Sequence, residues 1–178
     1  MTTTRRFCCD DLLRFAPTNL DPLTETYNFG FYLSYLARWP GMCSIQEGAT
    51  GRISSYMIGK AEGAGAEWHG HVSALTVAPE FRRLGLAKTL MAELERVSDT
   101  DYRGFFVDLF VRASNAVAAR LYVALGYTAY RRVLGYYGGG AREPPEDALD
   151  LRKRLPRDAE GRSIVPLPAP VEAYDVLR

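Results

Sequence analysis

The chain has 178 residues, of which 47% are hydrophobic and 24% are charged, a balance typical of one soluble domain large enough to bury a core. Its formal net charge of +1 gives it no overall attraction to nucleic acid or to anionic membranes. No apolar run approaches the length needed to span a bilayer, and aspartates follow the two N-terminal arginines too soon for a signal peptide. We therefore expect a soluble protein with no nucleic-acid specificity and no membrane partner.

Cysteine and histidine are scarce. Cys8, Cys9 and Cys43 are too few for a disulfide framework, and the first two, being adjacent, would point to opposite faces of a strand. We expect reduced thiols and a cytoplasmic location. His69 and His71 share one face at strand spacing and could in principle chelate a metal, but no third ligand lies nearby in the sequence. We predict no metal site.

The first part of the chain predicts antiparallel structure. An edge strand is followed by a helix, a proline-punctuated loop and a second helix, whose apolar residues recur near helical spacing until Pro40. Glycine-rich turns then separate three strand-like segments, which is a hairpin signal. The predicted elements are a strand at residues 4–11, helices at 10–15 and 31–40, and strands at 42–46, 52–61 and 68–78.

Helices and strands alternate after residue 78. Leucines recur every four residues over 86–97, which predicts an amphipathic helix. Residues 104–113 form a nearly continuous apolar run, as in a strand covered on both faces. Asn115 is placed to cap a second helix that ends at Gly126. Two further strands are predicted at residues 127–137 and 147–155.

This order of elements predicts an α/β fold. Antiparallel hairpins followed by alternating strands and helices indicate a mixed, mostly antiparallel sheet of seven strands, with helices on both faces. We assign residues 1–155 to this domain. The remaining residues, 156–178, contain four of the ten prolines, and we expect them to form a tail that runs extended over the surface or over a partner.

The most informative segment is the turn that follows the strand at residues 73–77. Arg82, Gly85 and Ala87 have the spacing R-x-x-G-x-A, and a helix-period segment follows at once. A helix N-terminus presents unpaired N–H groups and positive dipole charge, and glycine lets the backbone approach an anion closely. Arg82 and Arg83 can add charge-assisted hydrogen bonds. The pattern favours a pyrophosphate site, although by itself it fits equally well a capped loop with two solvated arginines.

The same spacing resembles the acyl-CoA-binding signature of the GNAT superfamily of N-acetyltransferases, in which this turn follows the fourth strand. A second stretch, NAVAARLYVALGY, matches that family's N-x-x-A-x-x-x-Y-x-x-x-G-(F/Y) signature. The resemblance implies the GNAT fold and acetyl-CoA as the cosubstrate. The cofactor-binding residues that it implies are Leu75, Thr76 and Val77 on the strand, Arg82, Arg83, Gly85, Leu86 and Ala87 at the turn, and Asn115 and Tyr122 on the second helix.

Two side chains are candidates for catalytic proton transfer. Tyr122 could donate a proton to the departing thiolate. His71, on the strand that leads into the turn, could take a proton from the amine directly or through water, because imidazole titrates near neutrality. His71 could instead recognise the substrate side chain. The sequence also leaves open a tyrosine and a histidine that only pack.

Longer stretches resemble the catalytic subunits of NatB, a class of protein N-terminal acetyltransferases. They cover nearly the whole chain and are LDPLTETY, FYLSYLARWP, GKAEG, EWHGHVSALTVAPEFRRLGLA, GFFVDLFVRASN, GYY and SIVPLP. The resemblance implies acetylation of the α-amine of nascent proteins that begin Met-Asp, Met-Glu, Met-Asn or Met-Gln. It also implies a large helical-repeat (TPR-like) auxiliary subunit that docks at the ribosome, and the aromatic segment 31–40 offers modest support for a partner.

The resemblance implies a set of peptide contacts as well. The family's pocket for the second substrate residue uses a histidine and a threonine two positions later, and serine replaces the threonine here, which keeps the hydroxyl and loses a methyl group. The glycines at 138–140 depart from a sharply defined hairpin. The implied substrate-binding residues are Glu25 and Tyr27, His71 and Ser73, and Tyr136 and Tyr137. Two other functions stay open: acetylation of lysine side chains or small amines, and a non-catalytic binding module.

Overall fold

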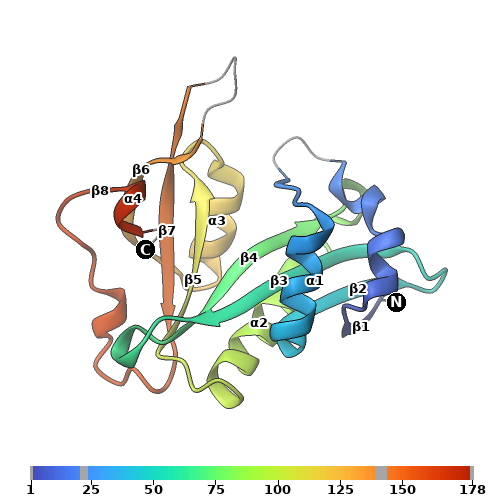
Figure 1. Cartoon of the computed structure of the whole chain (residues 1–178), viewed down its shortest axis with the longest axis horizontal. Coiled ribbons are helices and arrows are strands. Elements are labelled where there is room, and N and C mark those ends of the chain that lie inside the picture. The colour runs from blue at the N-terminus through green and yellow to red at the C-terminus, as the bar shows by residue number, and fades with distance from the viewer. Residues whose placement is uncertain (1, 21–23, 139–143, 177–178) are drawn as a thin grey trace.

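The computed structural model describes residues 2–20, 24–138 and 144–176, so part of the first loop and most of the glycine run after Gly138 lie outside the described residues. The described chain forms one mixed sheet in the order β1-β2-β3-β4-β5-β7-β6-β8 (Figure 1). Neighbouring strands are antiparallel except for β4–β5 and β6–β8. The strands are β1 (Thr2–Arg6), β2 (Cys43–Gly48), β3 (Ile53–Glu62), β4 (His69–Val77), β5 (Phe106–Arg112), β6 (Thr128–Tyr137), β7 (Glu146–Arg154) and β8 (Val171–Glu172).

Helices cover both faces of this sheet (Figure 1), so the predicted α/β class and layer arrangement are confirmed. None of the described helices is both long and apolar enough to cross a membrane. The α-helices are α1 (Phe29–Arg38), α2 (Leu86–Thr100), α3 (Ala116–Ala124) and α4 (Ala173–Val176), and short 3-10 helices lie at Cys9–Leu13, Ala16–Asn19, Pro40–Met42, Gly65–Glu67, Pro79–Phe81 and Arg162–Ile164.

Two details differ from the sequence prediction. The sheet has eight strands rather than seven, because β8 from the proline-containing tail pairs in parallel with the edge of β6, where Val133 lies opposite Val171. Leu167 extends this contact by donating its N–H to the carbonyl of Tyr130. The helix predicted at residues 10–15 is a short 3-10 helix, Cys9–Leu13. The strand predicted at residues 4–11 therefore ends earlier, at Arg6, because the chain turns there to enter this 3-10 helix.

Each face of the sheet has its own apolar core. On one face, the apolar stripe of α2 packs with residues of α3, β3 and β5, and Leu90, Met91 and Leu94 are fully buried there. On the other face, α1 and the first 3-10 helix cover β2 and β3, with Tyr32 and Leu36 buried. Burial of these apolar stripes is the main force that holds the helices on the sheet.

The centre of the sheet opens where β4 and β5 part. These two strands pair only from Gly70 to Val72 and from Val107 to Leu109, although β4 continues to Val77. Beyond the paired part, the carboxyl ends of two parallel strands separate, which is a common place for ligands in α/β sheets. The turn at residues 82–87 and the N-terminus of α3 both follow from these ends.

Candidate active site

Two cavities meet at this opening. One, of about 330 Å³, lies between β4, β5, β6 and the loop before α1, and the other, of about 740 Å³, extends toward the N-terminus of α2. They adjoin one another, since six residues line both of them. The shared residues are Thr24, Leu75, Thr76, Asn115, Ala118 and Tyr122.

All ten residues expected to bind the cofactor line the larger cavity, which we call the turn cavity. The end of β4 forms one wall, and the turn from Arg82 to Ala87 closes it at the start of α2. Gly85 immediately precedes α2 with φ of +79°, a left-handed conformation that favours glycine. A side chain at Gly85 would meet no protein atom within 4 Å, so the space above the turn is open to a ligand. Arg82 donates from Nε to the carbonyl of Val77 at 3.1 Å.

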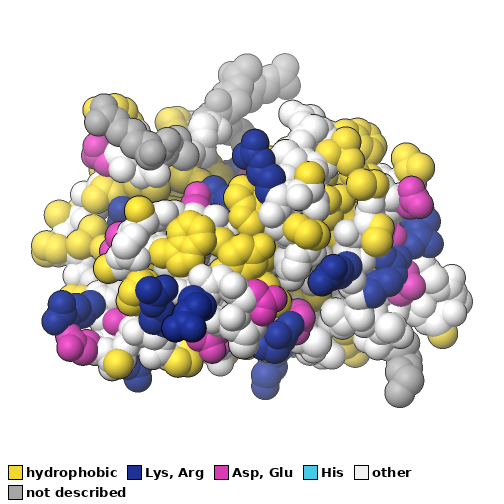
Figure 2. Space-filling model, turned by 60° about the horizontal axis from the view of Figure 1, so that its bottom comes forward, with side chains coloured by type: hydrophobic (Ala, Val, Ile, Leu, Met, Phe, Trp, Pro, Cys, Tyr) yellow, Lys and Arg dark blue, Asp and Glu magenta, His cyan; other side chains and the backbone are white. Residues whose placement is uncertain are grey.

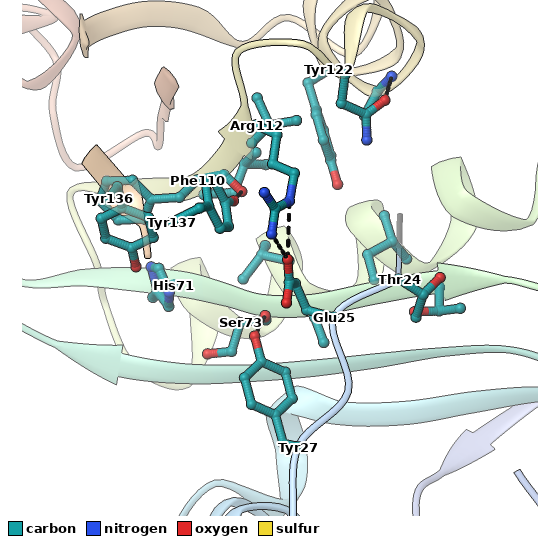
Figure 3. Close-up of a pocket in the computed structure, with 18 of the residues that line it drawn as sticks. Thr24, Glu25, Tyr27, His71, Ser73, Phe110, Arg112, Tyr122, Tyr136 and Tyr137 are labelled. Carbon is teal, nitrogen blue, oxygen red and sulfur yellow. Dashed lines mark hydrogen bonds and ion pairs between the residues drawn. The ribbon is translucent and has the colours of Figure 1, made fainter. Parts of the chain in front are cut away.

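Tyr122 stands at the junction of the two cavities. It projects from α3 toward the space above β4 (Figure 3) and is 8% exposed. Asn115 fixes the start of that helix because its side-chain oxygen accepts a hydrogen bond from the N–H of Ala118 at 3.1 Å. Burial raises the pKa of Tyr122 well above its ordinary value. Its hydroxyl therefore keeps its proton at neutral pH and can donate it.

All six residues expected to bind the substrate line the smaller cavity, which we call the peptide cavity. Tyr27 donates its hydroxyl to the carbonyl of Ser73 at 3.4 Å, and Ser73 donates to the hydroxyl of Tyr35 at 3.0 Å. On the other side, Tyr137 donates to the carbonyl of Phe110 at 3.1 Å. Burial raises the pKa of Tyr27 to about 12, so at neutral pH it is a neutral hydroxyl. Figure 3 shows these aromatic rings facing the cavity from two sides.

Two residues that the sequence analysis missed tie these sides together. Arg112, at the end of β5, pairs with Glu25 at 2.5 Å and with Glu146 at 3.1 Å, and its guanidinium lies 4.2 Å from the centre of the Tyr137 ring. Figure 3 shows the pair with Glu25 spanning the cavity. Phe110 stacks on Tyr136 with ring centres 4.6 Å apart. No local pattern signals the ion pair, because Glu25 and Arg112 lie 87 positions apart.

A buried carboxylate lies behind His71. Asp108 on β5 is 2.8 Å from His71 Nδ1 and 3.3 Å from His69 Nε2, which confirms that the two histidines share one face. Burial opposes ionisation of Asp108, but the two imidazoles hold its pKa well below the ordinary range. Burial likewise disfavours a charged His69, yet the contact with Asp108 raises the pKa of His69 above its ordinary value. The only sign of this buried carboxylate in the sequence is that Asp108 is a single aspartate inside the apolar residues 104–111.

Glu62 supplies a carboxylate near both histidines, which the sequence did not suggest. Ligand atoms of Glu62, His69 and His71 lie within 4.8 Å of one another. Hydrogen bonds and ion pairs already engage these groups, because Glu62 pairs with Lys60 at 2.5 Å and the imidazoles contact Asp108. Each of these three side chains thus has a charged partner among the described residues, and the absence of a metal stays a prediction.

Comparison with known proteins identifies the family. Residues 9–127 match the model of the acetyltransferase (GNAT) family. The chain is 56% identical over 171 residues to the N-terminal acetyltransferase B complex catalytic subunit NAA20 of Arabidopsis thaliana, covering 96% of this chain and 95% of the relative. It is 57% identical to N-alpha-acetyltransferase 20 of Dictyostelium discoideum, covering 98% of each chain.

Solved structures agree. The crystal structure of Chaetomium thermophilum Naa20 in complex with a bisubstrate analogue superposes with a TM-score of 0.90 at 40% identity, covering 98% of each chain. The NatB acetyltransferase complex bound to a bisubstrate inhibitor gives a TM-score of 0.85 at 38% identity, again covering 98% of each chain. The chain therefore belongs to the acetyltransferase (GNAT) family and, within it, to the NatB catalytic subunits.

Proposed function

We propose that this protein transfers an acetyl group from acetyl-CoA to the α-amine of protein N-termini that begin Met-Asp, Met-Glu, Met-Asn or Met-Gln. The observation that carries the proposal is the meeting of two cavities where β4 and β5 separate. The turn before α2 lines one of them, and aromatic hydroxyls surround the other. A thioester at the junction would face the amine of a peptide in the peptide cavity. The proposal is supported by two similar solved structures, one in complex with a bisubstrate analogue and the other bound to a bisubstrate inhibitor.

The residues of the turn cavity fit acetyl-CoA. The first N–H groups of α2 and the open space at Gly85 suit the pyrophosphate. Leu75, Thr76 and Val77 lie on β4 beyond its pairing with β5, so backbone groups on that side can bind the pantetheine chain. Bound acetyl-CoA would supply the activated acyl group and a thiolate leaving group.

His71 and Tyr122 divide the proton transfers between them. We assign to His71 the removal of the proton from the substrate ammonium, since an amine attacks a carbonyl only after losing it. We assign to Tyr122 the donation of its proton to the sulfur as the thiolate departs, a role for which its high pKa keeps it protonated. The ring of Tyr136 and the hydroxyl of Ser73 line the same cavity as His71 and would contact the second substrate residue.

The proposal includes a partner. We infer that the protein works in the cytoplasm with a large helical-repeat auxiliary subunit that brings it to ribosomes and nascent chains. On α1, the side chains of Phe29 and Leu33 are 57% and 44% exposed one turn apart, and they offer an apolar docking face. On the face in Figure 2, side chains of both charge signs are interspersed, which does not favour a nucleic-acid site.

A peptide panel tests this function. The complex with its auxiliary subunit is given acetyl-CoA and three peptides that share one internal lysine and differ only at the N-terminus. They begin with Met-Asp, with Ser-Asp, and with an N-terminally blocked Met-Asp. We expect a kcat/KM for Met-Asp at least about a hundredfold above that for the other two. Equal rates on Met-Asp and Ser-Asp would refute the NatB-type substrate class, and a faster rate on the blocked peptide would indicate a lysine acetyltransferase.

A further inference from the structure

Proton positions around Asp108 follow from its contacts. His69 Nδ1 lies 2.6 Å from the carbonyl oxygen of Glu67, and because a carbonyl only accepts hydrogen bonds, Nδ1 carries a proton. Asp108 is buried and ionised, so it also only accepts. His71 Nδ1, hydrogen-bonded to it at 2.8 Å, therefore carries a proton. His69 Nε2 lies 3.3 Å from the same carboxylate and forms an ion pair with it when it carries a proton.

These proton positions distinguish the two histidines. The contact with Asp108 raises the pKa of His69 and so favours a proton on both of its nitrogens, which makes it an imidazolium. In His71 the hydrogen bond to Asp108 places a proton on Nδ1, so Nε2 is the nitrogen that can carry a lone pair. His71 lines the peptide cavity whereas His69 does not, so that lone pair is the one available to a substrate.

We propose that Asp108 and His69 are positioning residues that hold His71 in the tautomer able to take the proton of the substrate ammonium. This inference rests on the proposed function. One N–H bond of the ammonium breaks and an N–H bond forms at His71 Nε2. The lone pair left on the amine forms a C–N bond to the acyl carbon, and the C–S bond breaks as the sulfur takes the proton of Tyr122. The amide nitrogen then gives up its second proton, which restores the Tyr122 hydroxyl through water, and the proton on His71 Nε2 passes to water.

The charges around His71 determine how it responds to mutation. Two carboxylates favour a positive charge on His71. One is Asp108 on β5, and the other is Glu62 on β3, whose carboxylate lies 3.8 Å away and is paired with Lys60. A positive charge on His69, which lies on the same strand, opposes a positive charge on His71. Tyr136 on β6 lines the same cavity and is neutral, because burial raises its pKa to about 12. On β7, Asp150 acts on Asp108 rather than on His71: burial and the charge of Asp108 raise the pKa of Asp150 to about 6, and Arg131 and Arg152 pair with it.

We therefore expect the profile of kcat against pH to shift in opposite directions in variants of His69 and of Asp108. In His69→Gln the opposing cation is gone, so the acid limb of kcat against pH should move up by about one unit. In Asp108→Asn the favouring anion is gone, so the acid limb should move down, and kcat should fall about tenfold or more because an asparagine no longer enforces the tautomer. The exposed pair of Glu93 and Arg96 on α2 provides a control, since Glu93→Gln should leave the profile unchanged.

The experiment measures kcat and KM for a Met-Asp peptide from pH 6 to 9 at saturating acetyl-CoA, using the complex with its auxiliary subunit. Losses of kcat with unmoved limbs in both variants would overturn the proposal, because a merely structural role lowers activity without moving the limb.

Nitrogen-15 histidine spectra of the unmutated protein give a second readout that needs neither folding of variants nor turnover. We expect a doubly protonated His69 and an Nδ1–H tautomer of His71 at pH 7, and a neutral His69 or an Nε2–H tautomer of His71 would contradict the inference. An enzyme inactive on Met-Asp but with the expected spectra would refute the proposed function alone.

Discussion

At the scale of single residues, Tyr122 has the most sharply defined environment of the site. Its side chain is buried at the junction of the two cavities, and burial alone raises its pKa. A phenol in this setting is a proton donor across the whole neutral range. The ring also packs in the core with Tyr127, at 5.9 Å between ring centres, so the proposed proton donor is also a core residue.

Tyr122→Phe separates these two roles. The variant keeps the ring and loses only the hydroxyl, so we expect kcat to fall about tenfold to a hundredfold while KM for the peptide and the Kd for acetyl-CoA change less than about threefold. Steady-state kinetics and a direct binding titration measure both quantities, and thermal unfolding checks that the fold is intact. An unchanged kcat would show that another group protonates the thiolate.

At the scale of elements, the parts that carry local signals were predictable. The helix after the turn was visible in its leucine spacing, and Asn115 does cap α3 as expected. The two-residue strand β8 has no such signal, because it exists only through the open edge of β6. Likewise, the pairing of Glu25 with Arg112 depends on a loop and a strand that only the folded sheet brings together.

Close packing of α2 on β4 gives an element-scale prediction. A Cβ on Gly70 would lie 2.1 Å from Ser98 Oγ and 2.8 Å from Ser98 Cβ, so no side chain fits there without moving the helix. We expect Gly70→Ala to lower the free energy of unfolding by about 1–3 kcal/mol, measured by urea denaturation. Adding Ser98→Ala should restore part of the loss. Gly48→Ala is the matched control, because nothing lies within 4 Å of a Cβ at that position. Equal stabilities for the two alanine variants would contradict this account of the interface.

At the scale of the whole molecule, the function depends on two halves of the sheet that part in the middle. One half ends in the turn before α2 and the other in the strands that carry Phe110 and Tyr136, and the two cavities meet between them. The turn from Arg82 to Ala87 is a local motif, so it could be predicted from the sequence. Residues from six separate stretches of the chain line the peptide cavity. The buried carboxylate behind it, Asp108, could be recognised only once β4 and β5 were placed side by side.

A structure of the complex with a bisubstrate analogue that joins CoA to a Met-Asp peptide tests this central claim most directly. We predict the pyrophosphate on the turn from Arg82 to Ala87, the joined nitrogen between His71 and Tyr122, and the aspartate side chain against His71 and Ser73. A pyrophosphate bound away from the turn, or a peptide that leaves the cavity between Tyr27 and Tyr137 empty, would contradict the account.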